Sequence, residues 1–221
     1  MVIVQFSVSV AIIVGTLIVS MQLKFMVEKE LGFDKEHLVV LKRVYPLGNR
    51  ISTFCNEIEK IPGVESASNS TTYLGFNNST ETYRIKGRNV SENFLFGTNY
   101  VDQNFLKTYN FKLAEKESRF FSDKFVTDSA AILVNKAAIL EYDIKDPYNT
   151  IILEPTIVGD TNELRIIGVV EDFHHSSLKE PVGPYMLRYQ TESHVWSGYI
   201  NIRLGVAGKG VLPTLKKIEK L

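Results

Sequence analysis

The residues best suited to chemistry lie together in the stretch GVVEDFHHSSLKEPVGP, residues 168–184. It contains two acids, Glu171 and Asp172, followed by the adjacent histidines His174 and His175. Such a set could bind a metal or transfer protons. However, the preceding run of β-branched residues predicts a strand, in which Asp172 and His174 would share one face while Glu171 and His175 would share the other. The pattern therefore favours the end of a strand and a turn.

A metal site would need more ligands than this stretch can bring together. Zinc takes three or four ligands at about 2–2.3 Å, and the other two histidines, His37 and His194, have no recognisable ligand spacing. The single cysteine, Cys55, cannot form an internal disulfide and falls near the apolar side of a predicted helix, so we interpret it as a core residue and not a reactive thiol. The sequence thus predicts no catalytic residue, no metal and no cofactor.

Charge and glycine patterns argue against two further classes of function. Lys plus Arg and Asp plus Glu number 25 each, so no net charge attracts nucleic acid. The stretches GFNNST and GVAGKG lack the spacing and the strand–loop–helix setting of a phosphate-binding loop. Glycosylation-type sequons at Asn69, at Asn77 and Asn78, and at Asn89 indicate exposed loops.

The first 23 residues contain no charged side chain before Lys24. At about 1.5 Å per residue, some 20 of them span a hydrocarbon core of about 30 Å, so the segment predicts a transmembrane helix. A cleavable signal peptide would have a basic start and an Ala-x-Ala-like site, and neither is present. A helix buried in a soluble protein would show a polar face, which the small, scattered Ser and Thr residues do not form. We therefore expect membrane lipid around residues 1–23.

The helix is expected to continue beyond the membrane as a stalk. Apolar residues recur every three to four positions through residues 22–31, and Gly32 is placed to cap the helix C-terminus. A separate amphipathic helix after a bend is the alternative. The lysines near the span, Lys24, Lys29 and Lys35, all follow it, and taken alone they would place the following domain in the cytoplasm.

The rest of the chain predicts a mixed α and β body. Residues 37–44 predict a strand, residues 49–61 a helix ended by Pro62-Gly63, and residues 64–73 a second strand. Near the other end, LRIIGVVEDF, YMLRYQ and GYINIRL predict strands, and VLPTLKKIEKL predicts a helix with an apolar stripe. The two ends therefore predict halves of one layered sandwich, with an insertion of roughly residues 80–162 between them that has its own small core.

Five stretches, in this order, resemble the MacB-like periplasmic core region of FtsX-type ABC transporter permeases. They are GTLIVSMQLKFMVEKELGFDKEHLVVL, IEKIPGVESAS, YVDQNFLKTYNFKL, AAILVNKAAI and IIGVVEDFHHSSLKEPVGP. Together they extend over almost the whole chain. Two places differ from the usual family pattern: Glu117-Ser118-Arg119 replaces a Gly-Arg turn, and DPYNTIIL lacks the Gly-Lys that usually follows Asp-Pro.

The resemblance implies an α+β fold with three parts. These are a transmembrane helix and stalk over residues 1–31, a Porter-like subdomain formed by residues 32–79 and 163–221, and a second α+β subdomain inserted at residues 80–162. The resemblance also implies a permease with further membrane helices in the bacterial inner membrane. Its main domain would lie in the periplasm, which reverses the topology that the lysines alone suggest.

The function implied by the resemblance is not enzymatic. Such a domain would couple cytoplasmic ATP hydrolysis to periplasmic conformational change, in export or in activation of a partner. The implied partners are a separate or fused ABC ATPase and a second permease copy, and a periplasmic or outer-membrane partner is compatible with this role. Nucleic acid is not expected. A membrane-anchored sensor ectodomain that binds a ligand is the alternative.

Two local expectations complete the prediction. Residues 32–34, Gly-Phe-Asp, stand where the membrane helix must end and pass to the first strand, so they are the expected point of coupling. By resemblance, Asp172, His174, Ser176 and Ser177 would cap and pin the turn after the strand through hydrogen bonds from side chain to backbone.

Overall fold

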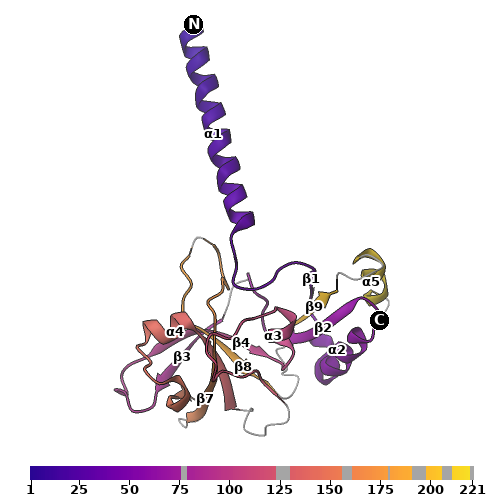
Figure 1. The fold of residues 1–221 in the computed structure, drawn as a ribbon, viewed down its shortest axis with the longest axis vertical. Helices are drawn as coiled ribbons and strands as arrows, with labels where there is room; N and C mark the ends of the chain where they lie inside the picture. Colours follow the sequence, from indigo (N-terminus) through magenta and orange to yellow (C-terminus); the bar gives the residue numbers. More distant parts are fainter. Residues whose placement is uncertain are drawn as a thin grey trace. The chain divides into compact units, whose positions relative to one another are not determined.

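The computed structural model describes residues 1–75, 79–122, 130–155, 161–178, 180–190, 198–205 and 211–219, apart from the side chains of residues 27 and 28. The chain divides into two compact units, Met1–Leu31 and Gly32–Leu221, which we describe separately (Figure 1). The first unit contains one helix. The second, which we call the body, contains all of the strands in the described part of the chain.

Helix α1 (Val2–Glu28) forms the first unit. Its Val2–Met26 segment has a mean hydropathy of 2.5 and is long and apolar enough to cross a membrane. The helix ends at Glu28, because Lys29 takes an extended conformation with ψ of 129° while its N–H still donates to the Phe25 carbonyl. The predicted continuation through residue 31, with Gly32 as the cap, is therefore wrong by three residues.

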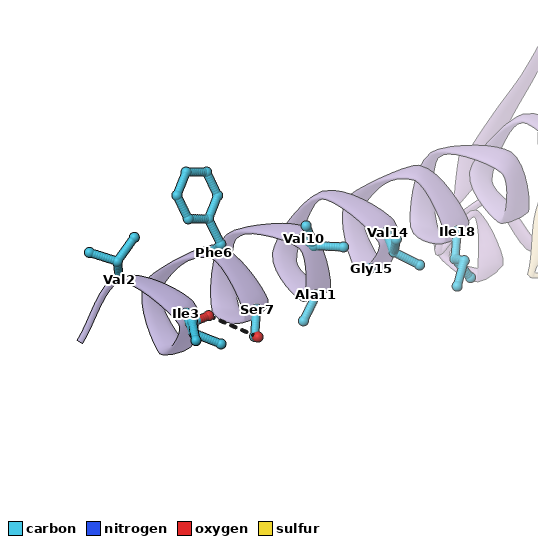
Figure 2. Close-up of a pocket in the computed structure, with 9 residues that line it drawn as sticks. All are labelled: Val2, Ile3, Phe6, Ser7, Val10, Ala11, Val14, Gly15 and Ile18. Carbon is cyan, nitrogen blue, oxygen red and sulfur yellow. Dashed lines mark hydrogen bonds between the residues drawn. The ribbon is translucent and has the colours of Figure 1, made fainter.

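Three hydroxyl side chains of α1 form hydrogen bonds within the helix itself. The hydroxyls of Ser7, Ser9 and Thr16 each donate to the carbonyl four residues earlier, at 2.9, 2.9 and 2.8 Å, and Figure 2 shows the Ser7 bond among the apolar side chains. Hydrocarbon offers no hydrogen-bond partner, so a helix that crosses it must satisfy such groups internally. The helix meets this requirement at all three positions.

At one end of the body lies a three-stranded sheet (Figure 1), and two helices share one core with one of its faces. The strand order is β1 (Leu38–Lys42), β9 (Tyr199–Leu204), β2 (Val64–Ser70), and β9 is antiparallel to both neighbours. Helix α2 (Ile51–Glu59) connects β1 to β2, and helix α5 (Val211–Ile218) follows β9. The predicted β-α-β start is therefore confirmed. The meeting of the two chain ends in this layer is confirmed for β9 and α5, whereas the other two predicted C-terminal strands, LRIIGVVEDF and YMLRYQ, pair with other strands.

The helix-covered face of this sheet is apolar, because residues of one parity on each strand point to the same side. Cys55 lies in this core with 4% of its surface exposed, as predicted, and burial raises the pKa of its thiol. The Asn69 sequon was predicted to lie in an exposed loop, which is wrong: Asn69 is buried in β2. Asn89 is exposed, and Asn77 and Asn78 lie outside the described residues. The buried members of the core are Val44, Ile51, Cys55, Ile58, Ala67, Ile200, Ile202, Leu204 and Ile218.

The remaining strands close into a six-stranded barrel. Pairing runs β4-β3-β6-β7-β5-β8 and returns to β4 through a parallel β4–β8 ladder. The strands are β3 (Ser79–Ile85), β4 (Phe94–Val101), β5 (Ala131–Asn135), β6 (Ile151–Pro155), β7 (Thr161–Val170) and β8 (Tyr185–Tyr189). The short helical elements are η1 (Tyr45–Arg50), α3 (Phe105–Thr108), α4 (Lys136–Glu141) and η3 (Pro147–Asn149).

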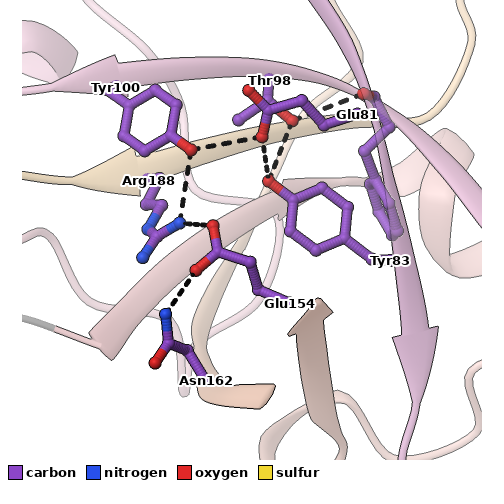
Figure 3. A network of polar contacts seen from close by, with 8 residues as sticks. Glu81, Tyr83, Thr98, Tyr100, Glu154, Asn162 and Arg188 are labelled. Carbon is purple, nitrogen blue, oxygen red and sulfur yellow. Dashed lines mark hydrogen bonds and ion pairs between the residues drawn. The ribbon is translucent and has the colours of Figure 1, made fainter. Parts of the chain in front are cut away.

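A polar network extends the buried barrel cluster on its inward-facing side (Figure 3). Arg188 follows the buried Met186 by two residues and Glu154 follows Ile152 by two, so both continue the inward face of their strands. The buried strand side chains of the cluster are Tyr83, Ile85, Phe94, Phe96, Ile132, Val134, Ile152, Leu164, Ile166, Val169 and Met186.

Glu81 and Arg188 hold this network together. The Glu81 carboxylate accepts from the hydroxyls of Tyr83 at 2.7 Å and Tyr100 at 3.2 Å. Arg188 forms an ion pair with Glu154 and donates to the Tyr100 hydroxyl at 3.3 Å. Side chains from β3, β4, β6 and β8 thus meet in one hydrogen-bonded group. Such a group helps to fix the register of the barrel, because a slip by one residue would turn its members outward.

Replacing Glu154 with Gln is expected to lower the free energy of unfolding by about 1–3 kcal/mol, because it leaves the Arg188 charge in a site where water reaches little of it. The two side chains of this pair are only 16% and 17% exposed. Glu163→Gln is the matched control, since it breaks the Lys86 pair whose side chains are 54% and 45% exposed, and it should cost less than about 1 kcal/mol. Urea unfolding measures both. Equal effects would show that the buried pair contributes nothing special.

The division of the body into subdomains at residues 80 and 162 stays a prediction. In the sheet, β7 begins at Thr161 and pairs with β6 and β5, while β8 pairs with β5 and β4. The three-stranded sheet joins the barrel through β2 and β4, which share the single register pair Ser70 with Val101.

Candidate functional site

The segment that opens the body is held by a buried arginine. Arg203, on β9, donates from Nη1 to the Asp34 carboxylate at 2.8 Å and to the Glu36 carbonyl at 3.3 Å. Its Nη2 donates to the Asp34 carbonyl at 2.8 Å, and its Nε donates to the Thr108 carbonyl at 2.6 Å. We call this group of contacts the junction clamp. It binds the segment to both β9 and α3.

The electrostatics of the clamp favour one fixed geometry. The Arg203 side chain is 8% exposed and that of Asp34 is 40% exposed. A guanidinium is planar and presents its donors in a rigid fork, so carbonyl and carboxylate acceptors must take set positions around it. Asp34 is held further by its own N–H, which donates to the Tyr109 carbonyl at 3.1 Å.

Aromatic packing secures the residue between Gly32 and Asp34. The Phe33 ring lies 5.5 Å from the Tyr109 ring in an edge-to-face arrangement and 6.4 Å from the Phe111 ring. Burial raises the pKa of Tyr109, whose hydroxyl donates to the Asn201 side chain at 2.8 Å. Pairs of this kind add to the stabilisation from burial alone.

Gly32 lies very close to the backbone of Asp172 and Phe173. Its φ is +79°, and a Cβ added there would lie 2.2 Å from the Asp172 carbonyl oxygen and 2.7 Å from Phe173 Cα. Real Cβ atoms do not come so close, so this position needs glycine for space as well as for its left-handed backbone. Phe173 is buried and packs edge-to-face on Phe111 and Tyr185, at 4.7 and 5.0 Å, so the chain it belongs to is well anchored.

The EDFHH stretch therefore lies against the junction. Its conformation differs from the predicted strand end and turn. Strand β7 ends at Val170, so the predicted alternation of Glu171 to His175 as a strand is wrong. Asp172 does not pin its own turn: its carboxylate accepts from the Ala137 N–H at 2.8 Å, at the start of α4. Glu171 forms an ion pair with Lys136 of the same helix at 2.8 Å.

Ser176 and Ser177 were predicted to pin the turn through side-chain bonds to the backbone. The Ser176 hydroxyl donates to the Glu180 carboxylate at 3.2 Å, a contact between side chains and not with the backbone. The Ser177 carbonyl accepts from the Glu180 N–H at 3.0 Å. His175 lies beside the Tyr185 ring, with centroids 4.5 Å apart, and burial lowers the pKa of His175, which favours the neutral imidazole.

The structure gathers no metal-binding set from the residues it describes. Within them, no group of three or more His, Cys, Asp and Glu side chains is placed to hold an ion. His37 contributes its backbone carbonyl to a bond from the Leu204 N–H at 2.9 Å. His194 lies outside the described residues. Residues 206–210 of GVAGKG and residues 76–78 of GFNNST also lie outside them.

Removing divalent metal with a chelator is expected to leave the melting temperature of the protein unchanged. The physical reason is that Glu171 and Asp172 already bind Lys136 and Ala137 in the structure. Calorimetry with and without chelator tests this, and elemental analysis should find no stoichiometric zinc. One equivalent of bound metal would contradict the prediction.

A buried polar surface surrounds the clamp. The second face of the three-stranded sheet carries Ser and Asn side chains: the Ser66 and Thr108 hydroxyls are 3.0 Å apart, and Asn201 donates to the Ser70 hydroxyl at 2.8 Å. Buried polar groups are costly unless they are hydrogen-bonded. The contact between this face and the α3 region is therefore made largely by specific polar bonds.

Comparison with solved structures places this architecture among known folds. The chain is similar to the periplasmic region of MacB from Actinobacillus actinomycetemcomitans, with a TM-score of 0.54 and 13% identity over 87% of this chain and 85% of that one. It is also similar to a domain assigned to a permease protein of Porphyromonas gingivalis, with a TM-score of 0.50 and 20% identity over 73% and 72% of the two chains. No protein-family model and no curated protein matches the sequence.

At these identities the likeness shows the fold. The α+β class with an apolar N-terminal helix is confirmed, and so is the resemblance to a MacB-like core region at the level of architecture. Sequence reasoning had placed the junction at residues 32–34 but missed Arg203. Arg203 was missed because polar residues at alternate positions of a strand such as GYINIRL normally indicate a face exposed to solvent.

Proposed function

We propose that this chain, which has the fold of the MacB periplasmic region, is the extracytoplasmic domain and one membrane helix of an ABC transporter permease. The fold supports this proposal, as does the apolar helix α1 with its internally satisfied hydroxyls. The proposed location is the bacterial inner membrane, with the body in the periplasm. The proposed role is not catalytic.

The observation that carries the proposal is the double attachment of the junction. Asp34 is bound to Arg203 of the three-stranded sheet, and Gly32 lies against the chain at Asp172 and Phe173, directly after barrel strand β7. Since Leu31 is covalently bonded to Gly32, a displacement of the membrane helix would reach both parts of the body. The junction would thus convert ATP-driven motion at the cytoplasmic side into rearrangement outside, for export or for activation of a partner.

The proposed assembly follows from this role. A separate or fused ABC ATPase would supply the motion, a second permease copy would complete the unit, and a periplasmic or outer-membrane partner would receive the change. The proposed Porter-like subdomain comprises residues 32–79 and 163–221, with residues 80–162 as the inserted second subdomain.

Cysteine labelling tests the topology. In a Cys55→Ala background, cysteines introduced at Lys24 and at the exposed Lys60 should react with a membrane-impermeant maleimide added from the periplasmic side. Trapping the ATPase with nucleotide should change the rate at position 24, because this position precedes the junction. Labelling from the cytoplasmic side alone would overturn the proposed orientation and support the simple count of lysines.

The alternative function, a membrane-anchored sensor ectodomain, is favoured by one observation: an open cavity is lined by the two clamp residues Asp34 and Arg203. The full reading frame distinguishes the two. Further hydrophobic spans support the permease, and a kinase-like or cyclase-like domain supports the sensor.

A further inference from the structure

The cavity beside the junction clamp has a volume of about 370 Å³ and opens to solvent. Its lining combines the clamp residues with α3 and the chain around it: Asp34, Glu65, Leu106, Lys107, Asn110, Phe111, Phe120 and Arg203. Small-molecule sites typically begin at about 300 Å³ and combine apolar walls with a few polar groups. This cavity reaches that volume, and its lining is more polar than is usual, with Leu106, Phe111 and Phe120 as the apolar part.

The charges of the lining specify what it can hold. Arg203 is already occupied by four acceptors, and Asp34 accepts from Arg203 and from the Glu36 N–H at 2.9 Å. Lys107 and Glu65 are exposed, and among the described residues neither side chain has a hydrogen bond or an ion pair. The cavity therefore offers one available cation and one available anion.

An apolar surface completes the lining. Phe120 is 47% exposed, a large value for a phenylalanine, and the buried Leu106 and Phe111 are the other apolar residues of the lining. A ligand that fits must present an ammonium to Glu65, a carboxylate to Lys107 and an apolar group to the ring of Phe120. A simple anion would meet the Asp34 and Glu65 carboxylates, and a simple cation would meet Lys107.

We propose that this cavity binds a small zwitterion with an apolar side chain, namely a free α-amino acid or a dipeptide. The ligand would touch Asp34 and Arg203, so its binding would favour the clamp geometry described above. This regulatory part rests on the proposed coupling function, whereas the binding itself does not.

The test is titration of the full chain in lipid nanodiscs with phenylalanine and with alanyl-phenylalanine, followed by calorimetry and saturation-transfer NMR. The two ligands distinguish an amino-acid site from a dipeptide site. N-acetylated and C-amidated forms of each remove one charge at a time. Glu65→Gln and Lys107→Gln should each raise Kd about tenfold or more, as expected for loss of a charged hydrogen bond. Glu65→Gln should also bind the N-acetylated and the free forms equally well, and Lys107→Gln should bind the C-amidated and the free forms equally well.

Matched controls are Glu57→Gln and Lys60→Gln, which remove an exposed charge pair at the C-terminal end of α2 that does not line the cavity. They should leave Kd unchanged. No binding at the solubility limit of both ligands, or a Kd unchanged in both cavity variants, would overturn the proposal. The outcome is separate from the coupling test: a failure of binding leaves the coupling role intact, and a chain that no longer couples should still bind the ligand.

Discussion

If the chain has the proposed coupling function, a flexible Gly-Ser insert between Leu31 and Gly32 is expected to abolish the nucleotide-driven rearrangement of the body while the partner ATPase continues to hydrolyse ATP. Every clamp residue follows the insertion point, so the bonds of Arg203 to Asp34 and Glu36 remain. An insert of about ten residues behaves as a coil with an end-to-end distance of about 17 Å, which absorbs small displacements of a helix. The body should therefore keep its thermal stability but receive no displacement.

The measurement uses spin labels at two exposed lysines of the body, Lys60 at the C-terminal end of α2 and Lys145 after α4, in the full-length protein with the proposed ATPase. The wild-type label distance should change when nucleotide is trapped, and that of the insert variant should not. The same insert placed after Gly87, in an exposed turn, is the control and should leave the change intact. If the junction insert leaves it intact as well, α1 is a plain anchor.

Gly32→Ala is expected to be the most damaging single substitution in the junction. The alanine must adopt a φ near +79° and must place its Cβ 2.2 Å from the Asp172 carbonyl oxygen. The left-handed backbone costs about 1–2 kcal/mol and overpacking about 1–3 kcal/mol, so the body should lose about 2–5 kcal/mol of stability or release the junction from Phe173. Urea unfolding measures the first outcome, and the rate of tryptic cleavage after Lys35, which leaves the clamp residues in place, measures the second.

Gly87→Ala separates the two contributions. Its φ is +88°, close to that of Gly32, but a Cβ added there meets no atom within 4 Å. This variant should therefore show only the backbone cost, about 1–2 kcal/mol, with unchanged nucleotide-dependent motion. Equal losses in the two variants would mean that the close approach of Gly32 to residues 172–173 has no energetic importance.

The elements of the body were predictable where one face of a strand or helix is apolar. The periodicity of residues 37–44, 49–61 and 198–204 predicted β1, α2 and β9, because their cores are built from alternate or helically spaced Val, Ile and Leu. Strand β2 was predicted as well, but the burial of its polar residues Asn69 and Ser70 was not. Local sequence cannot show that a polar face will be covered.

The candidate site was predictable only in its local part. Residues 32–34 could be recognised because a membrane helix must end before a strand begins. The partner of Asp34 could not, because Arg203 is 169 positions away and pairs through a tertiary contact. Likewise, Asp172 caps α4 from 35 residues away, so its role could not be inferred from the turn that follows it.

The single register pair between the three-stranded sheet and the barrel has a mechanical consequence. Ser70 pairs with Val101, and the flanking backbone bonds from Thr71 to Tyr100 and from Asp102 to Asn69 measure 3.0 and 3.3 Å. A long ladder resists torsion because many bonds must break together, whereas this short line of bonds, which we call the pivot, resists it less. We therefore expect any twist of the body to occur at this line, where the bonds of Ser66 to Thr108 and of Arg203 to the Thr108 carbonyl oppose it. A pull delivered through Gly32 and Asp34, which attach to opposite sides of the pivot, would act on it as a torque.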